Sequence, residues 1–409
     1  MSILVIIDRF RKGGFFEPVV VMSSAYLLIL VVGSVLFELI KEKEYRFYLS
    51  NFIGVGYFAL FAGLILSQNY HYTINLDQIK KYIFVTHSMK NRALVYFAVF
   101  ICILATFALF IKGGVPMLAA DVQQARLDLV SGNGFLNIFL YGLTVFPLAV
   151  LYDAIARGAR GSMIVSHLLA GFVTVVILLT GGRSRTFAFL AEYLAMYFFF
   201  YRRSFSFKLM VACTVLLTLF LAVVGAYRRG GEMDVPTMTK EIGIILATRP
   251  VMFSLVVDKF NESRMFYGSR YFGDLVKLLP GHQTGANVDL KYEVWPNADK
   301  MPDSSGVTPS VIGEAYMNFG VPGIFWFMFF EGLFLGLSYR FMLKKPTFLR
   351  CAFYFMLIID LGTAVSAGVG TRLTKFMLLW FWLAIIHFLY EWRLKLWEKT
   401  PDYGSSLAR

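Results

Sequence analysis

The sequence has little charge and few cysteines for its length. Of its 409 residues, 16% are Asp, Glu, Lys or Arg, whereas 58% are hydrophobic, and the mean hydropathy is +0.64. Soluble domains carry about 25% charged residues, so this composition excludes an ordinary soluble protein. The three cysteines, Cys102, Cys213 and Cys351, all fall within apolar runs. That placement argues against a disulfide framework and against a cysteine metal cluster.

Several signatures of common enzyme chemistry are also missing. The sequence contains no glycine-rich phosphate loop of the Walker type, no His-x-x-x-His and no Cys-x-x-Cys. ATP-driven transport and zinc-dependent hydrolysis therefore lose most of their support. The sequence also lacks Asp-x-Asp, the carboxylate pair with which many sugar-nucleotide transferases bind the metal that stabilises a leaving diphosphate. We therefore expect no metal and no cofactor, and arginines would have to neutralise any diphosphate.

Long apolar runs dominate what is present. A bilayer crossing takes about 20 residues. Uncharged runs of suitable length lie at 18–37, 51–68, 93–111, 134–152, 161–182, 209–227, 351–359 extended by 361–371, and 376–390. Two further runs each contain one acid, Glu192 in 186–201 and Glu331 in 322–339. The pattern predicts an all-α polytopic membrane protein of about ten transmembrane helices, whose intramembrane acids, Asp360 included, face the bundle interior.

The distribution of Lys and Arg predicts the orientation. With ten spans both termini share one side, and the short segments of that side hold 20 Lys and Arg against 9 in the short loops opposite. Both termini are therefore expected in the cytoplasm, and the net charge of +13 reflects topology and not nucleic-acid binding. The chain divides into transmembrane helices 1–227, an outward loop 228–308 and a C-terminal part 309–409. Within the loop, the apolar stretch 242–257, broken at Arg249-Pro250, predicts helices lying on the membrane surface.

Some outward-facing cations lack acidic neighbours in sequence. Arg183 and Arg185 lie in Gly-Gly-Arg-Ser-Arg-Thr, and Arg372 with Lys375 lies in Gly-Val-Gly-Thr-Arg-Leu-Thr-Lys. Arginine's forked guanidinium is suited to a phosphate or diphosphate. The alternative is that these side chains reach lipid headgroups or pair with intramembrane acids. Glu192, seven residues after Arg185, would then anchor that arginine.

The stretch Gly306 to Gly323 lies where the outward loop returns to the membrane. Thr308-Pro309 is typical of a helix start, and Gly-Val-Pro-Gly at 320–323 is a strong stop. We expect a short helix at about 309–319 before the next span, with Glu314 and Asn318 on one face. The loop also holds aromatic residues that either stack on sugars or anchor the loop at the membrane interface, namely Tyr267, Tyr271, Phe272, Tyr292 and Trp295.

Three short blocks carry a resemblance to a known family. They are Thr308 to Gly323, Gly113-Gly114-Val115-Pro116 with downstream Arg126, and Gly181-Gly182-Arg183-Ser184-Arg185. Together with the long outward loop, they resemble the bacterial oligosaccharide repeat-unit polymerases, the Wzy-type O-antigen polymerase family. The resemblance implies a glycosyltransferase of the GT-C type on the periplasmic side of the inner membrane. Its donor and acceptor would both be undecaprenyl-diphosphate-linked oligosaccharides, with membrane lipids and a chain-length regulator protein as further candidate partners.

Physical reasoning and this resemblance together suggest roles for individual residues. An acceptor hydroxyl needs a base, and a departing lipid diphosphate needs positive charge. Glu314 is the first candidate for the base or for an acceptor-positioning carboxylate, and His282 is the second candidate base. The candidate diphosphate ligands are Arg183, Arg185, Arg372, Arg228 and Arg229. The candidate glycan or acceptor ligands are Tyr316, Asn318 and Arg126.

Other interpretations of these residues and of the whole chain stay open. Glu314 would otherwise stabilise a helix by pairing with an arginine, and Arg126 would otherwise pair with Asp121 or Asp128. An O-antigen ligase of the same superfamily has a similar architecture and would attach the finished glycan to lipid A core. A transporter or flippase of lipid-linked sugars predicts broken helices in paired halves, and the sequence shows no clear internal repeat.

Overall fold

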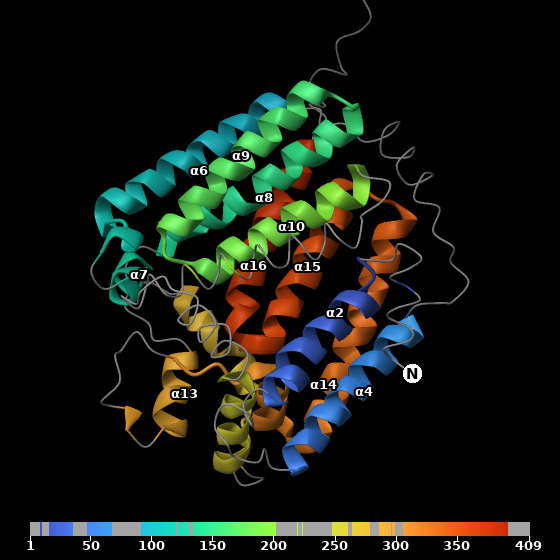
Figure 1. Ribbon diagram of the computed structural model, residues 1–409. Helices are drawn as coiled ribbons and strands as arrows, with labels where there is room; N and C mark the ends of the chain where they lie inside the picture. Colours follow the sequence, from blue (N-terminus) through green and yellow to red (C-terminus); the bar gives the residue numbers. More distant parts are fainter. Residues whose placement is uncertain are drawn as a thin grey trace, which may run out of the picture.

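The computed structural model describes most of the chain. The described residues are 9, 16–35, 47–67, 91–119, 122–130, 134–201, 219, 223, 248–260, 264–278, 286–295, 297–298 and 306–391. These residues form helices and connecting turns, with no strand among them. The molecule is an all-α polytopic membrane protein, as the apolar runs predict (Figure 1).

Eight of the described helical stretches are long and apolar enough to cross a membrane. The first is made of α2 (Pro18–Tyr26) continued by η1 (Leu27–Val32). The others are α4 (Phe47–Ser67), α6 (Arg92–Gly113), α8 (Gly134–Arg157), α9 (Arg160–Leu179), α14 (Ser310–Lys344), α15 (Phe348–Ala367) and α16 (Gly370–Glu391). The run containing Glu192 forms the 19-residue α10 (Arg183–Tyr201), and the run 209–227 falls almost entirely outside the described residues.

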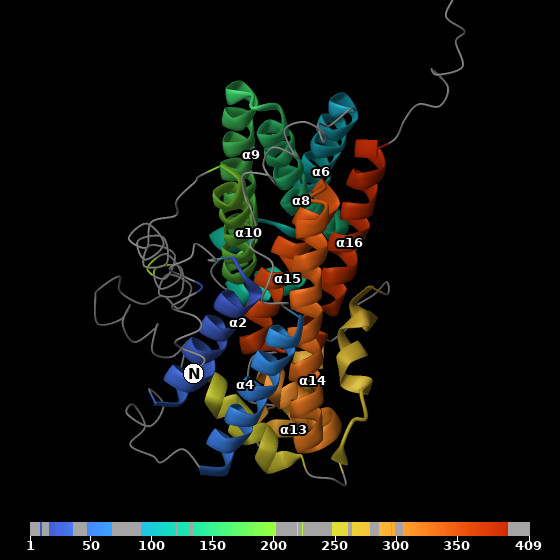
Figure 2. The ribbon, with the colours of Figure 1, turned by 90° about the vertical axis from the view of Figure 1, so that its right-hand side faces the viewer.

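The helices form two groups joined by a central pair. In Figure 1, α6, α8, α9 and α10 lie together on one side of α15 and α16, and α2, α4 and α14 lie on the other side. Figure 2 views the bundle from the side of α4 and α14. Aromatic residues connect α15 and α16 to the group formed by α6, α8, α9 and α10. Trp382 of α16 donates its indole N–H to the Ile138 carbonyl of α8 at 2.8 Å. Phe355 of α15 packs edge-on against Phe199 of α10.

One end of this bundle carries the additional short helices. In Figure 1, α7 (Val122–Val130) and α13 (Ala286–Val294) lie at the same end as the first residues of α10 and α16. We call this end the α13 end. The described connections at 114–119, 180–182 and 368–369 also lie at this end. The side of the membrane that the α13 end faces stays a prediction from the charge count.

Glycines let α4 and α14 approach within backbone contact. A Cβ atom at Gly63 would lie 2.1 Å from the Phe329 carbonyl oxygen, and one at Gly332 would lie 2.3 Å from the Leu60 carbonyl oxygen. Small residues at such crossings maximise van der Waals contact, which drives helix association in lipid. This crossing fixes the long arm of α14 against the bundle.

The helix α14 is broken where the Gly-Val-Pro-Gly stop predicts. Phe319 and Gly320 have non-helical dihedrals, with φ of +64° at Gly320, and they separate a short arm, 310–318, from a long arm, 321–344. A Cβ atom at Gly323 would lie 2.6 Å from the Ala315 carbonyl oxygen. The two arms therefore pack against each other at the α13 end, and glycine is required at the turn.

The start of the short arm corrects one prediction. Thr308 does not cap it: the helix begins at Ser310, whose hydroxyl accepts the Gly313 N–H at 3.3 Å. The Thr308 hydroxyl instead accepts a hydrogen bond from Arg249. From residue 248 the predicted surface stretch is helical as far as residue 259, and residues 242–247 lie outside the described residues.

A small second core supports the short arm from outside the main bundle. It joins helix 248–259, α13 and the underside of the short arm through Met252, Val256, Phe260, Leu290, Val294, Val307 and Met317. Helix 248–259 and α13 thus pack against the short arm of α14 and support it.

The α4–α14 crossing makes a testable prediction. Gly63→Ala should lower the thermal midpoint of the detergent-solubilised protein by several degrees, because overpacking of this kind costs about 1–3 kcal/mol. Gly54→Ala is the matched control on the same helix, since no atom lies within 4 Å of a Cβ placed there. Equal midpoints for the two variants would contradict the close crossing.

Candidate functional site

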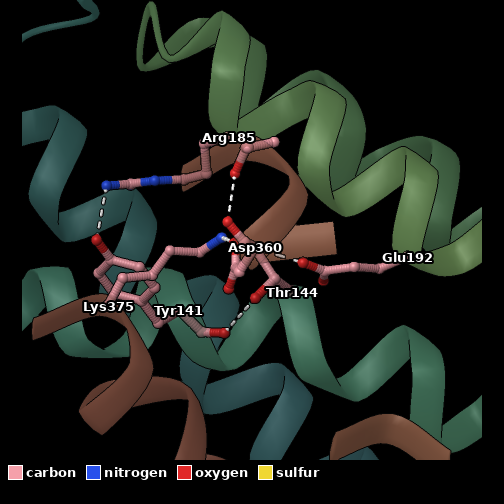
Figure 3. A network of polar contacts seen from close by, with 7 residues as sticks. Tyr141, Thr144, Arg185, Glu192, Asp360 and Lys375 are labelled. Atoms are coloured by element: carbon pink, nitrogen blue, oxygen red, sulfur yellow. Dashed lines mark hydrogen bonds and ion pairs between the residues drawn. The ribbon is translucent and has the colours of Figure 1, made fainter. Parts of the chain in front are cut away.

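Most of the described candidate residues gather around the first turns of α10 and α16. Arg185 lies in the first turn of α10, and Arg372 and Lys375 lie in the first two turns of α16. Figure 3 shows Arg185 and Lys375 in one polar network that also draws on α8 and α15. The N-terminal ends of helices carry partial positive charge, which adds to that of the side chains.

An ion cluster joins three helices beneath these turns. The Lys375 ammonium group pairs with Asp360 of α15, and it lies 4.0 Å from the Glu192 carboxylate of α10 (Figure 3). Asp360 is 0% exposed and Glu192 2% exposed, so the predicted inward orientation of both acids is confirmed. Arg372 is a further electrostatic neighbour of Glu192. The cluster ties α10, α15 and α16 together just below the helix starts.

Arg185 has a different partner from the one considered in the sequence. Its guanidinium donates to the Tyr141 hydroxyl of α8 at 3.0 Å and lies 4.6 Å above the Tyr141 ring (Figure 3). Glu192, the acid two turns along the same helix, pairs with Lys375 instead. A guanidinium has five N–H donors, so the bond to Tyr141 orients the group and leaves donors for a ligand.

Two of the glycine-containing sequence blocks meet beside Arg185. At Gly181, where φ is +69°, an added Cβ atom would lie 2.8 Å from Cδ of Arg126 on α7. At Gly113 an added Cβ atom would lie 2.8 Å from Leu129 of the same helix. The helix α7 therefore packs on both glycine turns and brings the Arg126 stem to the start of α10. The backbone of Arg183 opens α10, and its side chain is outside the described part of the structure.

Glu314 of the short arm holds the first turn of α16. Its carboxylate accepts the Val369 N–H and the Gly370 N–H, the latter at 2.9 and 3.0 Å from the two oxygens. The neighbouring glycines make room for it, because Cβ atoms at Gly368 and Gly370 would lie 2.9 and 2.4 Å from the carboxylate. A carboxylate at a helix N-terminus stabilises that helix. Glu314 therefore fixes the backbone two residues before Arg372.

Asn318 and Tyr316 both have partners within the fold. Asn318 is fully buried; its amide donates to the Glu314 carbonyl and accepts the Gly268 N–H, both at 2.9 Å. Asn318 thus ties the short arm to the segment leading into η4 (Ser269–Leu278). Tyr316 stacks on Phe52 of α4, with ring centroids 5.8 Å apart. Both side chains shape the α14 break.

A tyrosine of η4 adds a further polar group to this region. The Tyr271 ring stacks on Phe327 of the long arm, with centroids 5.0 Å apart and planes 8° apart. Burial raises the pKa of the Tyr271 phenol well above its ordinary value, and the carboxylates of Glu314 and Glu331 raise it further. The phenol is therefore a protonated hydrogen-bond donor throughout the physiological pH range.

Three candidates lie outside the described residues, namely His282, Arg228 and Arg229. Within the described ranges, no group of three or more His, Cys, Asp or Glu side chains is arranged to hold a metal ion.

Glu331 also belongs to this site. The sequence predicts only that its side chain faces the bundle interior. Its polar surroundings come from η4 and the short arm, which are distant in sequence.

The chain was compared with protein families, curated proteins and solved structures. The family model described as "Putative O-antigen polymerase" matches residues 15–381, which is most of the chain. No curated protein and no solved structure matched the chain.

The ion cluster predicts the effect of removing its cation. Lys375→Met would leave Asp360 buried without its partner, a change that costs about 3–5 kcal/mol in buried ion pairs. The thermal midpoint should fall sharply, and Asp360→Leu in the same chain should restore much of it. Lys344→Met, which removes an exposed lysine at the end of α14, serves as the control. A Lys375→Met variant as stable as this control would contradict the assignment.

Proposed function

Because the chain belongs to the O-antigen polymerase family, we propose that it is a glycosyltransferase that joins undecaprenyl-diphosphate-linked oligosaccharide repeat units. The growing glycan leaves its lipid diphosphate and is transferred to the terminal sugar of a new lipid-linked repeat. The product is O-antigen or a related surface polysaccharide, made at the periplasmic face of the bacterial inner membrane with both termini in the cytoplasm. The observation that carries this proposal is the cationic site at the α13 end of a membrane bundle.

The donor diphosphate binds at the starts of α10 and α16. Arg185 is oriented by Tyr141, and Arg372 lies two residues beyond the backbone held by Glu314. Preorganised cations aimed at the departing diphosphate stabilise the negative charge that develops on it. Arg183 at the start of α10 acts with them, and Arg228 and Arg229 are further ligands from the outward loop. Lys375 is committed to Asp360 and Glu192 and holds the helices together.

The acceptor lies on the side of the α14 break. For Glu314, the hydrogen bonds to Val369 and Gly370 support a positioning role, because both carboxylate oxygens are engaged by backbone N–H groups. His282 remains the second candidate base. Asn318 and Tyr316 act on the acceptor through the shape of the short arm, and Arg126 acts from α7 beside the Gly181 turn.

The surface of the bundle suits a lipid-linked substrate. Large apolar side chains are exposed along α6 and α9, including Phe97, Phe100, Leu104, Phe107, Ile164, Leu168 and Val175. Such a surface is stable only against acyl chains, so membrane lipids and the polyprenyl tail share this environment. A chain-length regulator protein remains a candidate partner, without an assigned surface.

Reconstitution tests the proposal. Purified protein in lipid vesicles, given lipid-linked repeats, should produce a ladder of extended glycans without added metal or nucleotide, and a chelator should leave the rate unchanged. Arg185→Ala and Arg372→Ala should each lower the rate by about 100-fold, the cost of removing one preorganised donor to a developing anion. Arg350→Ala, at the opposite end of α15, is the matched arginine control.

Loss of synthesis on chelation, or full chain extension by the Arg185 and Arg372 variants, would contradict these roles. A deletion strain distinguishes the related activities. Lipopolysaccharide carrying a single repeat unit supports a polymerase, and loss of all attached repeats indicates a ligase. Accumulation of lipid-linked repeats facing the cytoplasm indicates a transporter.

A further inference from the structure

Glu331 is a buried carboxylate without a partner. It lies on the long arm of α14, is 7% exposed, and neither of its oxygens has a hydrogen-bond partner in the described structure. An unpaired polar group in an apolar interior costs free energy, and an ionisable group inside a membrane bundle is retained chiefly for function. Glu331 therefore requires an explanation that its contacts within the fold do not supply.

Other buried acids of the bundle contrast with Glu331. Asp360 pairs with Lys375, and Asp153 pairs with both Arg157 and Arg92. These pairs explain how those carboxylates tolerate burial. Glu331 has no such cation within the described residues, so no ion pair among them accounts for its burial.

A second unpartnered polar group lies beside Glu331. The Tyr271 hydroxyl is buried without a hydrogen-bond partner, with the side chain of Asn318 close to it, and both Glu314 and Glu331 act on it electrostatically. Tyr271 stacks on Phe327, which lies one helical turn before Glu331 on the same face of the long arm. A donor and an acceptor, neither with a hydrogen-bond partner, thus lie near each other on the face of the long arm that carries Phe327. Sugars offer the complementary groups, because each hydroxyl both donates and accepts.

Glu314 is poorly placed to accept a proton in the same region. Its two oxygens already accept N–H groups from the first turn of α16, which it holds in place. A general base needs a lone pair directed at the proton it removes. Glu331 retains lone pairs on both oxygens, and Glu314 does not offer an equivalent free carboxylate.

We propose that Glu331 is the general base for the acceptor sugar, in a subsite that it forms with Tyr271. The inference rests on the proposed function, and it assigns Glu331 in place of Glu314 or His282. The acceptor hydroxyl donates to Glu331, and Tyr271 donates to a neighbouring sugar oxygen. The new bond forms between the acceptor oxygen and C1 of the donor sugar as the bond from C1 to the phosphate oxygen breaks. The proton passes to Glu331, and the electron pair leaves with the lipid diphosphate, held by Arg185 and Arg372.

Glu331→Gln tests this role, because it keeps the shape of the side chain and removes the base. Initial rates of the reconstituted full-length protein should show kcat lowered by at least about 100-fold, the usual contribution of a general base, with KM for the donor little changed. Glu331→Asp should retain more activity than Glu331→Gln. Tyr271→Phe should raise KM for the acceptor more than it lowers kcat.

The pH dependence of kcat separates a base from a packing residue. Activity that depends on a base is lost as the pH falls and the carboxylate becomes protonated, and this acidic limb should disappear from the residual rate of Glu331→Gln. Among the described residues, the titratable groups facing Glu331 are Glu314 from the short arm and Tyr271 from η4. The helix α4 contacts Gly332, the residue after Glu331, through the backbone of Leu60, which does not titrate. Glu17→Gln, which removes a buried carboxylate at the opposite end of the bundle, is the matched control.

Two results would overturn the assignment. One is a Glu331→Gln enzyme with kcat within threefold of the wild-type value. The other is loss of the acidic limb in Glu314→Gln or His282→Gln while Glu331→Gln keeps it. Thermal melting of each variant confirms that the folded state is being compared. Wild-type protein that makes no ladder would instead count against the proposed function, so the two failures are distinguishable.

Discussion

The organisation of this molecule depends on the cost of placing charge in an apolar bundle. A charged side chain at the centre of a membrane helix costs about 2.5–3.5 kcal/mol on insertion scales, so each such group must acquire a partner or a function. Lys375 meets this requirement by joining Asp360 and Glu192 across three helices. This pairing sets the positions of α10, α15 and α16, and thereby the arginines at the starts of α10 and α16.

The same constraint explains the arrangement at the α14 break. The short arm brings Glu314 to the N–H groups at 369–370, where a carboxylate satisfies both its own charge and the open end of α16. Asn318 then fastens η4 over the break. The cations at the starts of α10 and α16 and the carboxylate of Glu314 consequently lie on neighbouring elements, joined by the first turn of α16. The proposed transfer from a lipid diphosphate to a sugar hydroxyl requires an arrangement of this kind.

Much of the fold could be predicted from the sequence, because apolar length and glycine-proline stops act locally. The run 322–339 predicts the long arm, and Gly-Val-Pro-Gly at 320–323 predicts the break. Partners across the bundle could not be predicted. The spacing of Arg185 and Glu192 suggests a pair on one helix, yet α16 supplies a closer cation in Lys375, and Tyr141 of α8 orients the arginine. Likewise, the N–H groups that donate to the Glu314 carboxylate lie 55 and 56 residues away in the chain. Glu331 is distinguished by its lack of a hydrogen-bond partner, which only packing reveals.

The central claim is that arginines from α10 and α16 bind one diphosphate. A double-mutant cycle on the binding of undecaprenyl diphosphate to the protein in nanodiscs tests it most directly. The account predicts that Arg185→Ala and Arg372→Ala each weaken binding by about 10-fold or more, as loss of a charge-assisted bond of about 1.5–3 kcal/mol implies. It also predicts that the double variant loses clearly less than the product of the two effects, because the sites are coupled. Strictly independent effects, or binding unchanged in both single variants, would contradict a shared site.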